Sequence, residues 1–265
     1  MDFGAVVFII GAATLDLFFL FRYSHRDSHP EFPGIAQLKT RNLTLRVVFV
    51  TLITALMFTV PGQVGHSSIE HTPALSGMIL GSFVYALAAL LLVLFAMFNG
   101  KTSFAGLFLS PRTSLRTAVW KGVLYGIAAI PPTMLITAVT NNLIVRAGYT
   151  SESQPVIKWM TSPDTSMAAR IAIFMSAVVV APLAEEIIFR GILFPAVLKN
   201  KSWVFSAMVT GCIFSLIHFH PPSFLSIFVL SLFFCGGYSV TGSLITPIVM
   251  HMVFNGTATF FTFLV

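Results

Sequence analysis

The chain has 265 residues, of which 56% are hydrophobic and only 9% are charged, and its mean hydropathy is +0.90. This composition excludes a soluble globule and predicts an all-α, multi-pass integral membrane protein. The formal net charge of +6 does not indicate a nucleic-acid partner, because the basic residues are scattered through loops and span ends, where the lipid bilayer is their expected neighbour.

An N-terminal transmembrane region, residues 1–166, is predicted to contain four spans. They cover residues 3–21, 47–60, 77–98 and 122–139. The first span is not preceded by basic residues, so we expect it to be retained rather than cleaved as a signal peptide. The fourth contains Pro131 and Pro132, which must kink or break its helix.

The C-terminal region, residues 167–265, is predicted to add four spans, which gives a bundle of about eight. These cover residues 167–198, 203–219, 224–240 and 241–265. The stretch 167–198 exceeds the roughly 20 residues of an upright crossing, so it should be tilted, or kinked at Pro182. Lysine and arginine follow the first, third and fifth spans, which predicts both termini outside the cytoplasm. Short loops in a compact chain favour a bacterial inner membrane over the endoplasmic reticulum.

Three charged residues interrupt the apolar run of the fifth span. Each charge at bilayer depth costs roughly 2.5 kcal/mol or more, so the group indicates a functional site. Glu186 and Arg190 are four residues apart, in the order that favours an ion pair along a helix. Glu185 is turned about 100° away and has no basic residue at the corresponding position. We therefore expect Glu186 to be neutralised, and Glu185 to face a cavity and transfer protons.

The C-terminal spans carry further polar residues, His218, His251 and Asn255, that should face the bundle interior. Taken singly, a histidine could be interfacial and an asparagine could join helices. His251 and Asn255, four residues apart, share a helix face. Together with Glu185 they indicate a site for peptide-bond hydrolysis.

Two chemistries fit this set of residues. Glu185 could act as a general base on water, while the two histidines and the asparagine hold that water and stabilise an oxyanion. Alternatively, zinc, the one cofactor that the residues suggest, could be held by Glu185, His218 and His251. The chain lacks the His-Glu-x-x-His spacing of soluble zinc proteases, which weakens the metal hypothesis.

Three motifs occur in order in this region: Glu185-Glu186-x-x-x-Arg190, Phe214-x-x-x-His218 and His251-x-x-x-Asn255. In this the chain resembles the CAAX prenyl endopeptidase and bacteriocin-processing (CPBP, or Abi) family of intramembrane proteases. The resemblance implies catalytic roles for Glu185, His218, His251 and Asn255, and supporting roles for Glu186, Arg190 and Phe214.

The family includes enzymes that remove the last three residues of prenylated CAAX proteins, and it has been described both as metal-dependent and as glutamate-type. The resemblance therefore implies a membrane-embedded or lipidated protein substrate, without requiring that it be prenylated. Two alternatives are a proton- or ion-coupled carrier and a non-catalytic immunity or scaffold member of the same family. The absence of an evident inverted repeat and the complete motif set favour the enzyme.

Overall fold

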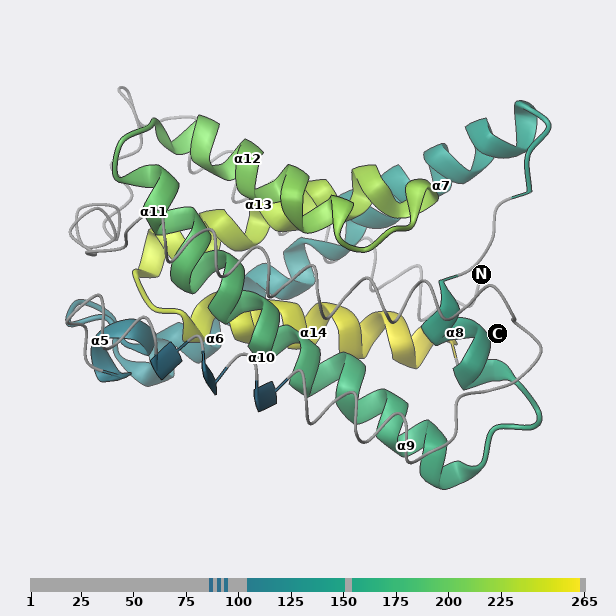
Figure 1. Ribbon diagram of the computed structural model, residues 1–265, viewed down its shortest axis with the longest axis horizontal. Helices are drawn as coiled ribbons and strands as arrows, with labels where there is room; N and C mark the ends of the chain where they lie inside the picture. The colour runs from purple at the N-terminus through teal and green to yellow at the C-terminus, as the bar shows by residue number, and fades with distance from the viewer. Residues whose placement is uncertain (1–85, 88–89, 92, 95–103, 151–153, 263–265) are drawn as a thin grey trace.

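The computed structural model describes residues 86–87, 90–91, 93–94, 104–150 and 154–262, which form a bundle of helices (Figure 1). These residues contain no strand, only an isolated bridge between Ser110 and Thr113, so the predicted all-α class is confirmed for this part of the chain. The spans predicted at 3–21 and 47–60, and most of that at 77–98, lie outside the described residues. The total of eight spans and the division at residue 166 therefore stay predictions.

Three continuous helical stretches are long and apolar enough to cross a membrane: Leu115–Arg146, Met167–Leu198 and Pro221–Thr241. Two shorter apolar helices accompany them, α12 (Trp203–Leu216) and α14 (Ile245–Thr262). The remaining elements subdivide these stretches or connect them. They are α5 (Phe104–Phe108), α6 (Leu115–Ala128), α7 (Ile130–Arg146), α8 (Pro155–Thr161), α9 (Met167–Met175), α10 (Ala181–Glu186), α11 (Phe194–Leu198), α13 (Phe224–Thr241), the π-helical segments η2 (Ser176–Val180) and η3 (Ile187–Leu193), and the 3₁₀ turn η4 (Pro221–Ser223).

The predicted fifth span, residues 167–198, has the limits found in the structure. The span contains two π-helical segments, and each ends two residues before a proline, Pro182 or Pro195. The predicted tilt or kink at Pro182 stays a prediction. A proline has no amide hydrogen and cannot continue the regular hydrogen-bond ladder. In η2 the amide of Ala181 bonds the carbonyl of Ser176, five residues back. The same pattern would pair the carbonyl of Ala177 with residue 182, which is proline, so this carbonyl is left for a side chain from another helix.

The fourth predicted span, 122–139, is part of the longer stretch Leu115–Arg146. The break expected at Pro131-Pro132 lies at Ala129, between α6 and α7. The proline pair occupies the first turn of α7, where a missing amide hydrogen costs little because that position has no intrahelical partner.

Helix α14 packs along α6, and two glycines allow the close approach. A Cβ atom on Gly122 would lie 2.7 Å from Val249 Cβ, and one on Gly126 would lie 2.9 Å from the carbonyl oxygen of Met250. Small residues four apart let membrane helices approach until their backbones touch. The glycines thus set the position of the part of α14 that carries His251.

Helix α13 lies among α7, α12 and α14, and it also contacts η3 (Figure 1). Phe234 of α13, Phe214 of α12 and Phe189 of η3 are buried here, with ring centroids of Phe189 and Phe214 5.0 Å apart and those of Phe214 and Phe234 6.5 Å apart. Two rings of this aromatic cluster, Phe214 and Phe234, lie against the guanidinium of Arg190.

Candidate active site

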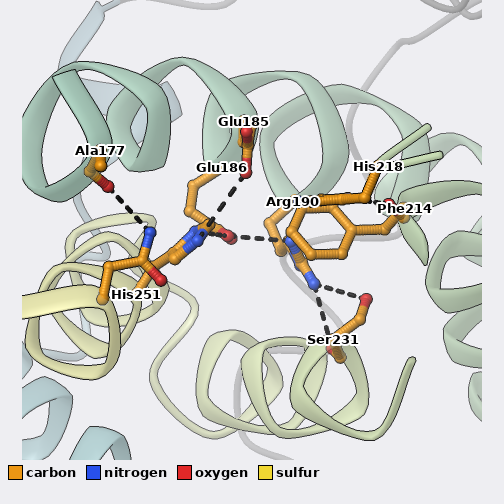
Figure 2. Close-up of polar contacts among 9 residues, drawn as sticks. Ala177, Glu185, Glu186, Arg190, Phe214, His218, Ser231 and His251 are labelled. Atoms are coloured by element: carbon orange, nitrogen blue, oxygen red, sulfur yellow. Dashed lines mark hydrogen bonds and ion pairs between the residues drawn. The ribbon is translucent and has the colours of Figure 1, made fainter. Parts of the chain in front are cut away.

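Glu186 and Arg190 form the predicted ion pair (Figure 2). Arg190 Nη1 donates to Glu186 Oε1 at 2.9 Å, and both side chains are 0% exposed. A buried ion pair needs further hydrogen bonds to offset the loss of water around both charges. The surroundings of Arg190 and Glu186 supply them from two other helices.

Arg190 is bound by α13 as well. Its Nη2 donates to the hydroxyl oxygen of Ser231 at 2.6 Å and to the carbonyl oxygen of the same residue at 3.1 Å. Its Cζ atom lies 4.6 Å from the ring centroid of Phe214 and 5.0 Å from that of Phe234, within the range of a cation–π interaction. The guanidinium therefore connects the fifth span to α12 and α13.

His251 of α14 lies between the two glutamates. Its Nδ1 is 3.0 Å from Glu186 Oε1 and its Nε2 is 3.7 Å from Glu185 Oε2. Because the Glu186 carboxylate paired with Arg190 is an acceptor, we assign the hydrogen to Nδ1 of His251, which turns the Nε2 lone pair towards Glu185. The pattern resembles the way a buried carboxylate orients a catalytic histidine in hydrolases.

The two glutamates have different surroundings, as the helical periodicity predicted. Glu186 is fully buried and accepts from two side chains, whereas the side chain of Glu185 is 12% exposed. A water molecule can reach only a carboxylate with some exposed surface. Glu185 is therefore the better placed of the two for chemistry with water.

His218 follows the end of α12 and is oriented by its own helix. Its Nδ1 is 2.7 Å from the carbonyl oxygen of Phe214, so the carbonyl accepts and Nδ1 carries the hydrogen. The ring of Phe214 contacts both imidazoles, with centroids 4.9 Å from His218 and 5.9 Å from His251. Phe214 therefore packs against both histidines of the site (Figure 2).

Asn255 lies one turn beyond His251 on α14, and its contact is with the backbone. Its Nδ2 donates to the carbonyl oxygen of Ala177 at 2.8 Å, in the π-helical segment η2. This is the carbonyl that Pro182 leaves without an amide donor. Asn255 therefore fastens α14 to the fifth span, a contact that the sequence did not predict.

The described residues do not form the predicted zinc site. No three histidine, cysteine, aspartate or glutamate side chains among them lie close enough to hold a metal ion, and Glu185, His218 and His251 are all included in that search. The structure brings Glu185 and His251 together but does not join His218 to them as a third ligand. We therefore derive no catalytic step through a metal.

Ser231, Phe234 and Ala177 are the residues of this site that sequence reasoning missed. Ser231 is one of three serines in α13 and has no charge or spacing that would distinguish it from the other two. Ala177 takes part through its carbonyl, which no side-chain motif can reveal. A pattern search could only have noted that Pro182 leaves a nearby carbonyl unpaired.

Residues 167–257 match the family model described as Type II CAAX prenyl endopeptidase Rce1-like. The resemblance predicted from the three motifs is confirmed. The matched stretch, which is similar to this family of CAAX-type proteases, includes every residue of the site described above.

The chain is also 29% identical over 92 residues to a protein of Bacillus subtilis (strain 168) named "Putative membrane peptidase YdiL". The alignment covers 35% of this chain and 37% of that relative, so the chain matches little more than a third of the relative's length. No solved structure matches the chain significantly. The three helices that are long and apolar enough to cross a membrane, together with the similarity to this family, indicate an integral membrane protein.

Proposed function

We propose that the protein is an intramembrane endopeptidase that hydrolyses a peptide bond of a membrane-embedded or lipidated protein, with Glu185 as the general base. The observation that carries the proposal is the contrast between the two adjacent glutamates. Oε1 of the fully buried Glu186 is held by Arg190 and His251, whereas Glu185 has exposed surface beside the Nε2 atom of the same histidine. The family similarity supports the reaction class, and it gives no support to the carrier or scaffold alternatives.

In the proposed reaction, the hydrolytic water binds between Glu185 and His251. Nε2 of His251 accepts one hydrogen bond from this water, and Glu185 removes the other proton as the oxygen attacks the carbonyl carbon of the substrate. The carbon–oxygen bond forms while the carbonyl electrons move to the substrate oxygen. The electrons of the oxyanion then re-form the carbonyl bond, the carbon–nitrogen bond breaks, and Glu185 returns its proton to the leaving amine.

His218 and Asn255 are proposed to contact the peptide bond that is cleaved. Each has one polar group held by a backbone carbonyl, Phe214 for His218 and Ala177 for Asn255. The second Nδ2 hydrogen of Asn255 is proposed to bind the developing oxyanion, and the Nε2 lone pair of His218 is proposed to accept from the amide N–H of the scissile bond. Donors held rigidly in this way stabilise a tetrahedral intermediate without reorganisation.

The substrate is proposed to reach the site from the lipid phase, since the catalytic residues lie within apolar helices. A C-terminal segment of a lipidated protein, including a prenylated CAAX type, fits this route and the family similarity. We place the protein in a bacterial inner membrane in preference to the endoplasmic reticulum, because the sequence is compact.

The test is peptide cleavage by purified protein in detergent, with lipidated and plain peptides and with or without a chelator. Glu185→Gln should abolish cleavage without unfolding the protein, because the amide has almost the same shape but cannot accept a proton. Asp164→Asn, at an exposed position between α8 and α9, is the matched control and should retain wild-type activity. Glu185→Gln with full activity would refute the assignment of the base.

Chelator-resistant cleavage would support the glutamate mechanism, whereas activity lost together with stoichiometric zinc would establish a metalloprotease. If the wild type cleaves no peptide, the proposed function is refuted and the carrier and scaffold hypotheses are favoured instead. Measurement of proton uptake into vesicles that contain the protein would then separate those two.

A further inference from the structure

We propose that Ser231 is a positioning residue of the active site, which acts on His251 through Arg190 and Glu186. The inference rests on the proposed function and names a residue outside the three sequence motifs. Ser231 lies on α13, is fully buried, and contacts neither glutamate nor histidine in any hydrogen bond described above. Its influence on the reaction must therefore pass through the guanidinium that it binds.

Ser231 determines the in-plane orientation of the Arg190 guanidinium. The rings of Phe214 and Phe234 attract the charge of this group, but they supply no directed hydrogen bond. Nε of Arg190 has no hydrogen-bond partner among the described residues. The orientation is therefore fixed by Nη1, which binds Glu186, and by Nη2, which binds the hydroxyl and carbonyl of Ser231.

Arg190 in turn determines where one carboxylate oxygen lies. Glu186 Oε1 accepts from Arg190 at 2.9 Å and from His251 Nδ1 at 3.0 Å. Because both donors share this atom, a rotation of the guanidinium moves the acceptor away from the imidazole. Hydrogen bonds weaken steeply with such misalignment.

The consequence for His251 is a change of tautomer rather than of position alone. When Glu186 Oε1 accepts from Nδ1, the Nε2 atom keeps its lone pair on the side of Glu185, 3.7 Å away. A weaker Nδ1 contact increases the fraction of molecules that carry the hydrogen on Nε2. Those molecules cannot accept a hydrogen bond from the hydrolytic water, so kcat should fall while KM stays nearly constant.

The experiment compares Ser231→Ala with Ser231→Thr, which retains the hydroxyl. The matched control is Ser239→Ala, another fully buried serine of α13, whose hydroxyl binds Trp203 Nε1 and the Cys235 carbonyl rather than Arg190. We expect Ser231→Ala to lower kcat by about tenfold, the effect of losing one charge-assisted hydrogen bond. KM should change by less than about twofold, Ser231→Thr should recover most of kcat, and Ser239→Ala should match the wild type.

A second readout does not depend on activity. Nitrogen-15 NMR of histidine-labelled protein reports the tautomer of His251, whose signal is identified by its loss in His251→Gln. The fraction protonated at Nδ1 should fall in Ser231→Ala and stay unchanged in Ser239→Ala. If the wild type cleaves no peptide, the proposed function fails, but the NMR result still decides the role of Ser231. Wild-type kcat and tautomer in Ser231→Ala, or an equal loss in Ser239→Ala, would overturn the proposal.

Discussion

Replacement of Gly122 by alanine tests how closely α14 must approach α6 for the active site to form. The new Cβ would lie 2.7 Å from Val249 Cβ and 2.9 Å from the Thr246 carbonyl oxygen, and neither atom can move without the backbone of α14. Ordinary contact begins at 3.4 Å, so α14 must shift by roughly 0.7 Å. His251 lies two residues after Val249 and would move with the helix.

Two opposing terms set the size of the effect on stability. Overpacking of a tight interface costs about 1–3 kcal/mol. Alanine in place of glycine inside a helix returns about 0.4–1 kcal/mol through the unfolded state. Gly236 of α13 isolates the second term, because a Cβ there would meet no described atom within 4 Å. The two variants should therefore differ by about 1–3 kcal/mol in free energy of unfolding, with Gly236→Ala the more stable.

The assay is reversible unfolding in mixed micelles, followed by circular dichroism, combined with peptide cleavage. Activity of Gly122→Ala should fall by at least about tenfold, since displacements of about 1 Å in a catalytic group can cost 10²-fold. Gly236→Ala should retain the kcat of the wild type. Equal stability and equal kcat in the two variants would refute the close contact between α6 and α14 as the determinant of the position of His251.

Three further predictions concern the buried ion pair, the contact of Asn255 with the fifth span, and the orientation of the protein in the membrane. Arg190→Met should lower the free energy of unfolding by about 3–5 kcal/mol, because it leaves Glu186 buried without its partner; a protein of wild-type yield and unfolding midpoint would contradict this. Asn255→Leu removes the hydrogen bond to the backbone of η2 and should lower the free energy of unfolding by about 0.6–1.7 kcal/mol. Amide hydrogen exchange in Ser176–Val180 should become faster, and unchanged exchange would show that the contact is not formed. The basic loop after the fifth span should face the cytoplasm, so an impermeant maleimide should label Lys201→Cys from the cytoplasmic side and Tyr149→Cys from the other; the reverse pattern would invert the topology.

Local periodicity explains why part of the site could be predicted. Residues four apart on a helix are neighbours, whatever the helix packs against. The sequence therefore sufficed to pair Glu186 with Arg190 and to place His251 and Asn255 on one face. Hydropathy and length likewise gave the limits of the fifth span, because lysines follow its last apolar residue.

The contacts between helices could not be predicted in this way. Which atom of His251 meets Glu186 depends on how far α14 is displaced along the fifth span, and Gly122 and the π-helical segment η2 affect that displacement. A π-helical turn also rotates every residue that follows it, so a regular helical wheel becomes unreliable beyond Val180. Glu185 is still the more exposed glutamate, because the pairing that buries Glu186 involves Arg190, only one turn away.

The sequence by itself determined the membrane class, the helical fold of the described part, the three motifs and the difference between the two glutamates. Each of these depends on composition or on residues within one or two helical turns. Only the tertiary structure decided that Ser231 binds Arg190, that Asn255 binds the carbonyl of Ala177, and that Glu185, His218 and His251 do not converge as metal ligands. Those outcomes depend on the relative placement of four helices, and that placement arises from close packing at small residues and from backbone groups freed by proline. Neither feature shows in the sequence which helices will meet.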